Sequence, residues 1–228
     1  MIDGPDDITA EWLTSVLRAR ARDANVREVR IEQIGTGQTG ASFRLHLDAE
    51  GALPPTLVAK TAAGDRVQRE RVGPGYRSEV GFYTDFRDRV RIRTPRCWYA
   101  DISDDNCSFV LVLDDLAPAR PGVQADGCTV AQAEDAVRNL AGLHAPVWND
   151  PMLLTHADWL TSMTGSRSEF LGTVTRSAAE IFVDRYADAL AGDGETLRRI
   201  IRVQGHIGGA SLEDGKQRHD ELARAFQA

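Results

Sequence analysis

The chain has 228 residues, 42% of them hydrophobic and 27% charged, which is typical of a globular protein with one large domain or two small ones. Its net charge of -7 argues against a nucleic-acid partner, because binding to phosphate backbones needs clustered positive charge. The sequence has no apolar run near the roughly 18 residues of a membrane span, no secretory signal, and cysteines without metal-type spacing. We therefore expect a cytoplasmic protein with reduced thiols that contacts neither nucleic acid nor membrane.

The first half of the sequence predicts a sheet. Apolar residues recur at every second position in several runs, such as Phe43, Leu45 and Leu47, and this period is that of a β-strand. The expected elements, in chain order, are a helix at 9–22, strands at 26–34, 41–49 and 55–62, a helix at 75–91, and a hairpin with strands at 96–102 and 107–113. We expect the strands to form one antiparallel sheet, with the second helix packed against it.

The second half predicts helices after a linker rich in proline and glycine. Thr129 and Gln132 form a capping-box pattern for a helix that ends near His144. A second capping-box pattern at Ser166 predicts a long helix that ends near residue 192. The residues of this long helix that are expected to point inward are Phe170, Val174, Ile181, Phe182 and Tyr186. The fold class is therefore expected to be α+β, with a strand-rich half, a linker and a helical half.

Residues 35–40, GTGQTG, match a glycine-rich pattern that occurs in two kinds of nucleotide site. A dinucleotide-binding fingerprint needs a helix directly after the glycines, so that the helix N-terminus meets the pyrophosphate. The alternating run 41–49 predicts a strand there instead. The pattern thus favours a hairpin that folds over nucleotide phosphates, through Gly35, Gly37 and Gly40, or a plain hairpin whose glycines only serve a tight turn.

Two charged residues support the phosphate-binding interpretation. Lys60 follows Gly40 by twenty positions and lies on a predicted strand. Lys60 and Lys216 are the two lysines of a chain whose other basic residues of this kind are all arginines. Glu79 lies on the next predicted helix. In protein kinases a strand lysine of this kind contacts the α- and β-phosphates, and a helix glutamate pairs with it. We therefore expect the charged ends of Lys60 and Glu79 to lie within or near salt-bridge distance.

Over residues 8–160 the chain resembles the aminoglycoside phosphotransferase and ecdysteroid-kinase-like (choline-kinase-like) superfamily of small-molecule kinases. The segments that carry the resemblance are GTGQTG at 35–40, LVAK at 57–60, SEVGFY at 78–83, TPRCWYA at 94–100, LVLDDLAP at 111–118 and LAGLHAPVW at 140–148. The resemblance implies a protein-kinase-like fold that binds ATP. Its predicted parts are a nucleotide-binding N-lobe at 1–113, a hinge at 114–128 and a partial helical C-lobe at 129–228, with a divergent tail from about 204.

The resemblance also implies roles for individual residues. Gly35, Gly37, Gly40 and Lys60 would contact the phosphates of ATP, and Glu79 would orient Lys60. The backbone of 111–118 would meet the adenine. Asp114 and Asp115 are interpreted as polar residues beside the hinge, not as metal ligands, and His144 as a structural residue.

The segment that performs phosphoryl transfer in this superfamily, H-G-D-x-x-x-x-N followed by a metal-binding Asp, has no counterpart here. His156, Ala157 and Asp158 match it only superficially, because Met163 stands at the Asn position, and no asparagine follows Asn149. We therefore expect no catalytic residue and no metal ligand, although the superfamily uses magnesium.

The expected function is that of an ATP-dependent small-molecule O-phosphotransferase family member, truncated before the catalytic loop and inactive as an isolated chain. The alternatives are a non-catalytic nucleotide-binding or regulatory kinase-like module, and a relative that shares the fold without nucleotide affinity. The expected partners are a nucleotide bound weakly and an unknown small-molecule acceptor. Self-association is expected through apolar residues of the incomplete C-lobe: Leu140, Leu143, Phe170, Phe182 and Tyr186.

Overall fold

The computed structural model describes residues 2–35, 37, 39–120, 122–123, 126–154, 159–160, 166–189, 192–196 and 198–199, with the side chains of 154 and 166–171 left out. It divides the chain into two compact units, residues 1–160 and residues 161–228. The linker expected at 114–128 lies inside the first unit. No helix in the described part of the chain is both long and apolar enough to cross a bilayer.

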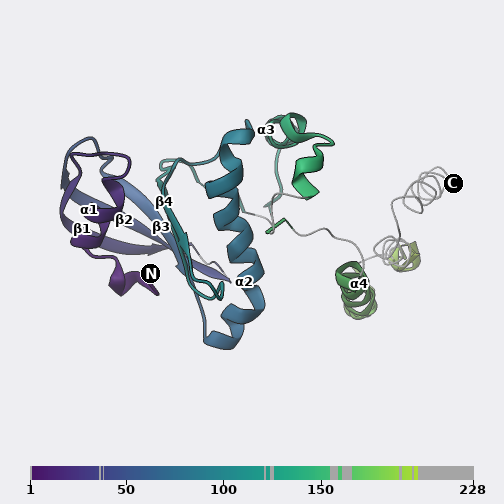
Figure 1. Ribbon diagram of the computed structural model, residues 1–228. Helices are drawn as coiled ribbons and strands as arrows, with labels where there is room; N and C mark the ends of the chain where they lie inside the picture. Colours follow the sequence, from purple (N-terminus) through teal and green to yellow (C-terminus); the bar gives the residue numbers. More distant parts are fainter. Residues whose placement is uncertain are drawn as a thin grey trace. The chain divides into compact units, whose positions relative to one another are not determined.

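Unit 1 is built on one five-stranded antiparallel sheet with the order β1-β2-β3-β5-β4 (Figure 1). The strands are β1 (Asn25–Ile34), β2 (Gly40–Glu50), β3 (Thr56–Ala62), β4 (Cys97–Ile102) and β5 (Phe109–Asp114). All five strands were predicted from the sequence, the first two of them from the alternation of apolar residues, and the α+β class is confirmed. The last residue of the glycine-rich turn, Gly40, begins a strand, so the helix that a dinucleotide-binding fingerprint needs is absent at this point.

A short helix covers one face of the sheet. Helix α1 (Ala10–Leu17) follows a 3-10 turn, η1 (Pro5–Asp7), and Thr9 caps it by accepting a hydrogen bond from the Trp12 amide at 3.1 Å. The helix ends five residues earlier than the predicted position 22. The core on this face includes Leu13, Leu17, Ala24, Phe43, Leu45, Leu57, Ala59, Val110 and Val112.

The opposite face carries the longer helix α2 (Arg66–Gly81), continued by a π-turn η2 (Phe82–Phe86) and a 3-10 turn η3 (Arg87–Arg89). The prediction that this helix starts at residue 75 was wrong, because the sequence Gly-Pro-Gly at 73–75 has the composition of a loop. Asp65 caps the true start by accepting from the Gln68 amide at 2.9 Å. A Cβ on Gly73 would lie 2.8 Å from the Asn106 carbonyl oxygen, so this glycine lets the β4–β5 turn pack closely on the helix.

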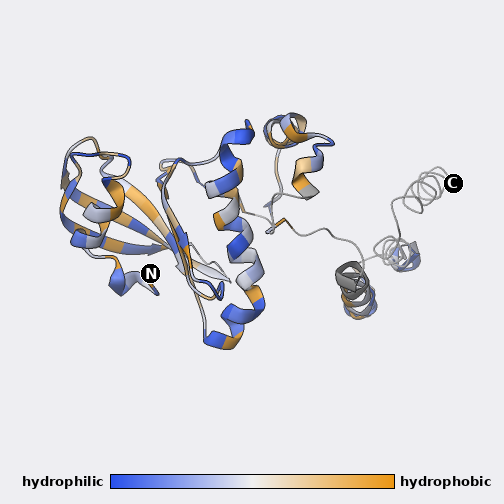
Figure 2. Ribbon diagram, in the orientation of Figure 1, coloured by the Kyte–Doolittle hydropathy of each residue, from blue (hydrophilic) through white to orange (hydrophobic). Residues whose placement is uncertain are grey.

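The side chains of strand β5 pack on both faces of the sheet. Phe109, Leu111 and Leu113 pack in the α2-side cluster, whereas Val110 and Val112 pack in the α1-side cluster. Because side chains alternate between the faces of a strand, this uninterrupted apolar run is what a central strand covered on both sides requires. The edge strand β1 and its neighbour β2 carry hydrophilic residues between the hydrophobic ones (Figure 2).

After the linker, unit 1 continues with helical elements. Helix α3 (Val130–His144) has the predicted capping box at Thr129 and Gln132 and ends where the sequence predicted. Two 3-10 turns follow, η5 (Ala145–Val147) and η6 (Pro151–Leu154). A small cluster made of Phe86, Val90, Val147 and Trp159 joins this part to the end of α2.

Unit 2 contains helix α4 (Ser166–Arg185), which ends before the predicted position near residue 192. Its buried residues with described side chains are Ala179 and Val183. The predicted inward face was wrong at four positions, since Val174, Ile181, Phe182 and Tyr186 are between 46% and 61% exposed. The predicted Phe170 and the capping box at Ser166 concern side chains outside the described set.

Candidate functional site

The two charged residues singled out in the sequence meet on the α2 side of the sheet. The Lys60 Nζ on β3 lies 2.7 Å from both carboxylate oxygens of Glu79 on α2, and both side chains are about one-third exposed. The predicted ion pair is therefore present. Its partial exposure leaves the ammonium group accessible from one side.

The glycine-rich turn ends directly beside this pair. Gly40 pairs with Ala62 in the sheet, and Ser42 pairs with Lys60 itself. A Cβ on Gly40 would lie 3.1 Å from the Thr61 carbonyl oxygen and 3.5 Å from Cε of the lysine, so a side chain at position 40 would press on the stem of Lys60. The turn and the ammonium group therefore lie next to each other because of strand register.

The other two glycines shape the turn between β1 and β2. Gly35 has a φ of 72°, a left-handed conformation that most residues avoid. A Cβ on Gly37 would collide with the Gly40 carbonyl oxygen, so the backbone folds back closely on itself there. Thr36 and Gln38 lie outside the described residues. All three predicted glycines thus have a steric reason to be glycine in this turn.

A cavity of about 460 Å³ opens on the same face of the sheet, one step along β3 from Lys60. Val58 lines it, and because Val58 and Lys60 are two positions apart, their side chains share a face. The remaining lining residues are Ile34, Gly35, Ser42, Arg44, Pro95, Leu113, Asp114, Asp115, Leu116, Ala117 and Ala119. Residues 114–117 and 119 of the predicted hinge therefore line the cavity, and the glycine-rich turn contributes Gly35. The volume lies in the ordinary range for small-molecule sites.

An ion pair that the sequence did not reveal crosses the edge of this cavity. Arg44 on β2 donates from Nε to Asp115 Oδ2 at 2.7 Å, and the side chain of Asp115 is only 6% exposed. Hydrogen bonding from Arg44 is the main reason why the pKa of Asp115 lies below its ordinary value. The neighbouring Asp114 accepts a hydrogen bond from the Trp98 indole at 2.7 Å. Both aspartates thus have hydrogen-bond partners within the protein.

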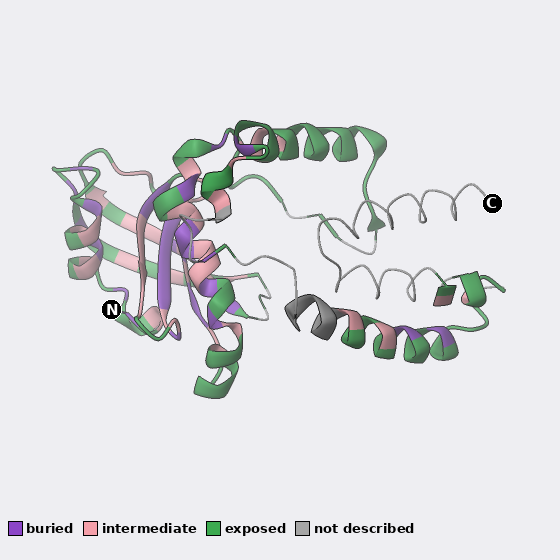
Figure 3. Cartoon of the chain, turned by 45° about the vertical axis from the view of Figure 1, so that its right-hand side comes forward, coloured by how far each residue is buried: buried purple, intermediate pink, exposed green. Residues whose placement is uncertain are grey.

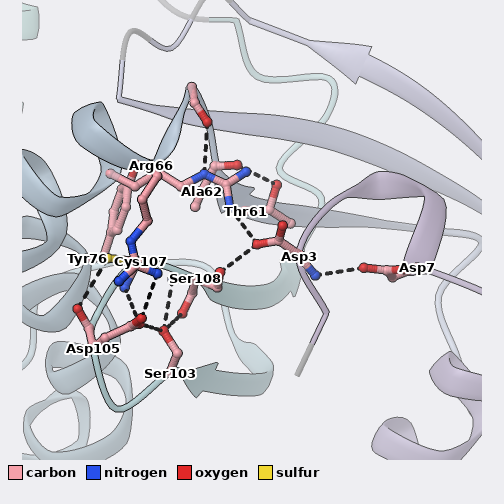
Figure 4. Close-up of polar contacts among 12 residues, drawn as sticks. Asp3, Asp7, Thr61, Ala62, Arg66, Tyr76, Ser103, Asp105, Cys107 and Ser108 are labelled. Atoms are coloured by element: carbon pink, nitrogen blue, oxygen red, sulfur yellow. Dashed lines mark hydrogen bonds and ion pairs between the residues drawn. The ribbon is translucent and has the colours of Figure 1, made fainter.

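Helix α2 is tied to the rest of unit 1 near its beginning. Arg69 pairs with Asp3 at 2.5 Å, and Asp3 also accepts from the Ser108 hydroxyl at 2.5 Å (Figure 4). Both contacts help to hold the pKa of Asp3 below its ordinary value, the Ser108 bond most strongly. Arg66 pairs with Asp105 in the β4–β5 turn at 2.9 Å. These contacts link residues up to 105 positions apart, and no local pattern in the sequence indicated them.

The end of α2 is tied down by Trp159. The Ser78 hydroxyl donates to the Trp159 carbonyl at 3.0 Å, and the Trp159 indole donates to Asp85 at 3.0 Å. A Cβ on Gly81 would lie 2.6 Å from the indole ring, so the absence of a side chain at this position lets the ring pack against the helix backbone. The residues just before it, His156, Ala157 and Asp158, lie outside the described residues.

Comparisons with known proteins find similar solved structures but no similar family model or curated sequence. No protein-family model matches the chain, and no curated protein matches it. One similar solved structure is that of a Ralstonia eutropha JMP134 protein provisionally described as an aminoglycoside phosphotransferase, with 15% sequence identity and a TM-score of 0.43. The match covers 75% of this chain and 47% of that one, so the chain spans about half the length of the structure it matches.

Proposed function

We propose that unit 1 binds ATP in the manner of a kinase-like small-molecule phosphotransferase, with the phosphates at the glycine-rich turn and Lys60 and the base in the neighbouring cavity. The observation that carries the proposal is the Lys60–Glu79 ion pair placed directly beside Gly40. A lysine fixed by a helix carboxylate under a glycine-rich hairpin is the arrangement that protein kinases use to hold α- and β-phosphates.

The hydrogen-bonding capacity of the ammonium group suits this role. A lysine has three N–H donors, and the bonds to Glu79 Oε1 and Oε2 use two of them. The third donor is left for a phosphate oxygen. Glu79 keeps the flexible lysine stem in one place, so that less conformational freedom is lost when the phosphate binds.

The cavity suits a flat, largely apolar group with a few polar atoms. Its apolar lining includes Val58 and Leu113 from the sheet, and the backbone of 114–119 runs along one wall. A purine ring buries well against such aliphatic side chains, and a strand-end backbone offers donors and acceptors for its edge. We therefore assign the base to this cavity.

The described residues do not fit the magnesium that such phosphotransferases use. They contain no group of three or more His, Cys, Asp or Glu side chains that could hold a metal ion. The carboxylate nearest the proposed phosphates, Glu79, is bound to Lys60. The proposed activity of this chain is therefore nucleotide binding, and the transfer step is not part of it.

The proposal is tested by calorimetric titration with ATP and, separately, with adenosine. Lys60→Ala should weaken ATP binding by roughly 10- to 100-fold, the range expected when a hydrogen bond to a charged group is lost. Adenosine binding should be unchanged, because adenosine has no phosphate. Lys216→Ala, which removes the other lysine of the chain, is the matched control and should bind both ligands like the wild type.

Two outcomes would refute the proposal. The first is an absence of ATP binding by the wild-type chain at millimolar ATP, which would favour a relative that shares only the fold. The second is an equal loss of ATP affinity in Lys60→Ala and Lys216→Ala, which would point to a non-specific charge effect.

A further inference from the structure

Tyr76 connects α2 to the glycine-rich turn. Its hydroxyl donates a hydrogen bond to the Thr39 carbonyl, one residue before β2 begins. The side chain is only 4% exposed, and its ring stacks on Phe109 of β5 with the ring centroids 4.5 Å apart and an interplanar angle of 29°. A buried ring fixed on a central strand is a rigid support for the backbone carbonyl that it contacts.

The end of the turn also packs against this pair of stacked rings. A Cβ on Gly40 would lie 3.7 Å from Phe109 Cζ, which is ordinary van der Waals contact, so the end of the turn rests on this aromatic pair. The backbone at 39–40 is thus held by a hydrogen bond from Tyr76 and by packing on Phe109. Strand pairing of Gly40 with Ala62 adds the third contact.

Tyr76 also precedes Glu79 by three positions in α2. Residues three apart lie on neighbouring positions of one helix face. One helix face therefore contacts the turn through Tyr76 and the lysine through Glu79. A displacement of α2 along or away from the sheet would move both contacts together.

We propose that Tyr76 is a positioning residue that couples the glycine-rich turn to Lys60 through α2. This rests on the proposed function, since the coupled groups are the two that would hold the phosphates. By binding the Thr39 carbonyl, the hydroxyl holds the end of the turn in one position relative to Lys60, so the phosphate site is formed before the nucleotide binds. Without that bond the turn would have to be ordered by the ligand, at a cost in affinity.

The variant Tyr76→Phe tests this, because it keeps the stacked ring and removes only the hydroxyl. We expect ATP binding to weaken about threefold to tenfold, as for the loss of one neutral hydrogen bond, with adenosine binding unchanged. Amide hydrogen exchange should become faster in the peptide that spans the turn and stay unchanged in β3 and β5. Tyr99→Phe on β4, which removes a hydroxyl bound to Asp101, is the matched control and should change neither measurement.

A double-mutant cycle tests the coupling itself. If α2 links the two contacts, the losses of ATP affinity in Tyr76→Phe and Glu79→Gln will not add in the double variant. Additive losses would overturn the coupling, and an unchanged ATP affinity in Tyr76→Phe would overturn the positioning role even if the turn exchanges faster. Unchanged exchange in the turn would show that Tyr76 is a core residue only. This measurement tests whether Tyr76 holds the turn in place even if the wild-type chain binds no ATP.

Discussion

Two regions of the chain differ in how fully their apolar residues are buried. One is the sheet with helices α1 and α2, and the other consists of the later helices α3 and α4. In β5, residues 109–113 are at most 8% exposed, and apolar clusters lie on both faces of the sheet. Helix α3 has no buried residue, and Val137 on it is 66% exposed. The contrast is visible in the burial map of the chain, where buried residues gather in the sheet (Figure 3).

This difference indicates where the stability and the proposed function of the chain reside. The glycine-rich turn, Lys60, Glu79 and the cavity all belong to the sheet and the helix on its face, where most apolar residues are buried. Helices with a large exposed apolar surface, in contrast, usually have a partner that covers it. We therefore expect the phosphate site to survive changes in α3 and α4 that leave the sheet intact.

The largest expected effect concerns phosphoryl transfer, for which the sheet half alone is not sufficient. With ATP and a panel of small hydroxyl compounds, the purified chain should consume ATP no faster than a protein-free control, whereas enzymes accelerate such reactions at least about 10⁶-fold. The physical reason is that the sequence contains no H-G-D-x-x-x-x-N segment to orient the acceptor and bind the metal.

Variants make this outcome interpretable. Turnover that is lost in Lys60→Ala and retained in Asp158→Ala would show that other residues build the metal site. Turnover lost in both variants would identify residues 156–158, which lie outside the described residues, as the catalytic loop.

The second effect compares the two regions in stability. Leu57→Ala in β3, at a fully buried position, should lower the free energy of unfolding by about 2–5 kcal/mol through lost burial and a cavity. Val137→Ala on α3 should change it by less than about 0.5 kcal/mol. Urea denaturation of both variants is the measurement. A large loss in the α3 variant would show that this helix is covered in solution.

A third, smaller effect concerns self-association through the helical region. Phe182 on α4 and Tyr186 just after its end are 46% and 47% exposed, and their ring centroids lie 4.8 Å apart, which makes a compact apolar surface. If a second copy of the chain covers it, Phe182→Ser should weaken the association about tenfold, as for the loss of one buried aromatic side chain. Asp188→Ser is the control, and sedimentation velocity measures the oligomer. A wild-type chain that stays monomeric at all concentrations would refute this expectation.

The smallest effect is the pH dependence that arises from Asp115. Its pKa is lower in the folded chain than the ordinary 3.8, so the ionised carboxylate stabilises the fold. That contribution is fully present above the ordinary pKa and is lost as the pH falls through the lower pKa of the folded state. Asp115→Asn cannot form the ion pair with Arg44, so its stability deficit relative to wild type should shrink as the pH falls below the ordinary pKa of 3.8. A deficit that stays constant over this range would show that the ion pair contributes no stability.

The elements and the principal charged pair of the site were predictable from the sequence because their signals are local. The first two strands follow from a period of two in apolar residues, and the capping box at Thr129 from residues three positions apart. Lys60 and Glu79 were recognised because the order of glycine turn, strand and helix places them on adjacent elements. The start of α2 was missed because the Gly-Pro-Gly at 73–75 has the composition of a loop, and the close approach of the β4–β5 turn to Gly73 cannot be seen in the local sequence.

Only the tertiary structure decided which distant side chains meet around the site. Arg44 and Asp115 are 71 positions apart, Arg69 and Asp3 are 66 apart, and Tyr76 reaches Thr39 across 37 positions. Each of these contacts depends on the strand order and on the side of the sheet that α2 covers. A repeating pattern in the sequence reports only which face of its own element is buried, so it carries no information on the neighbour that this face will contact.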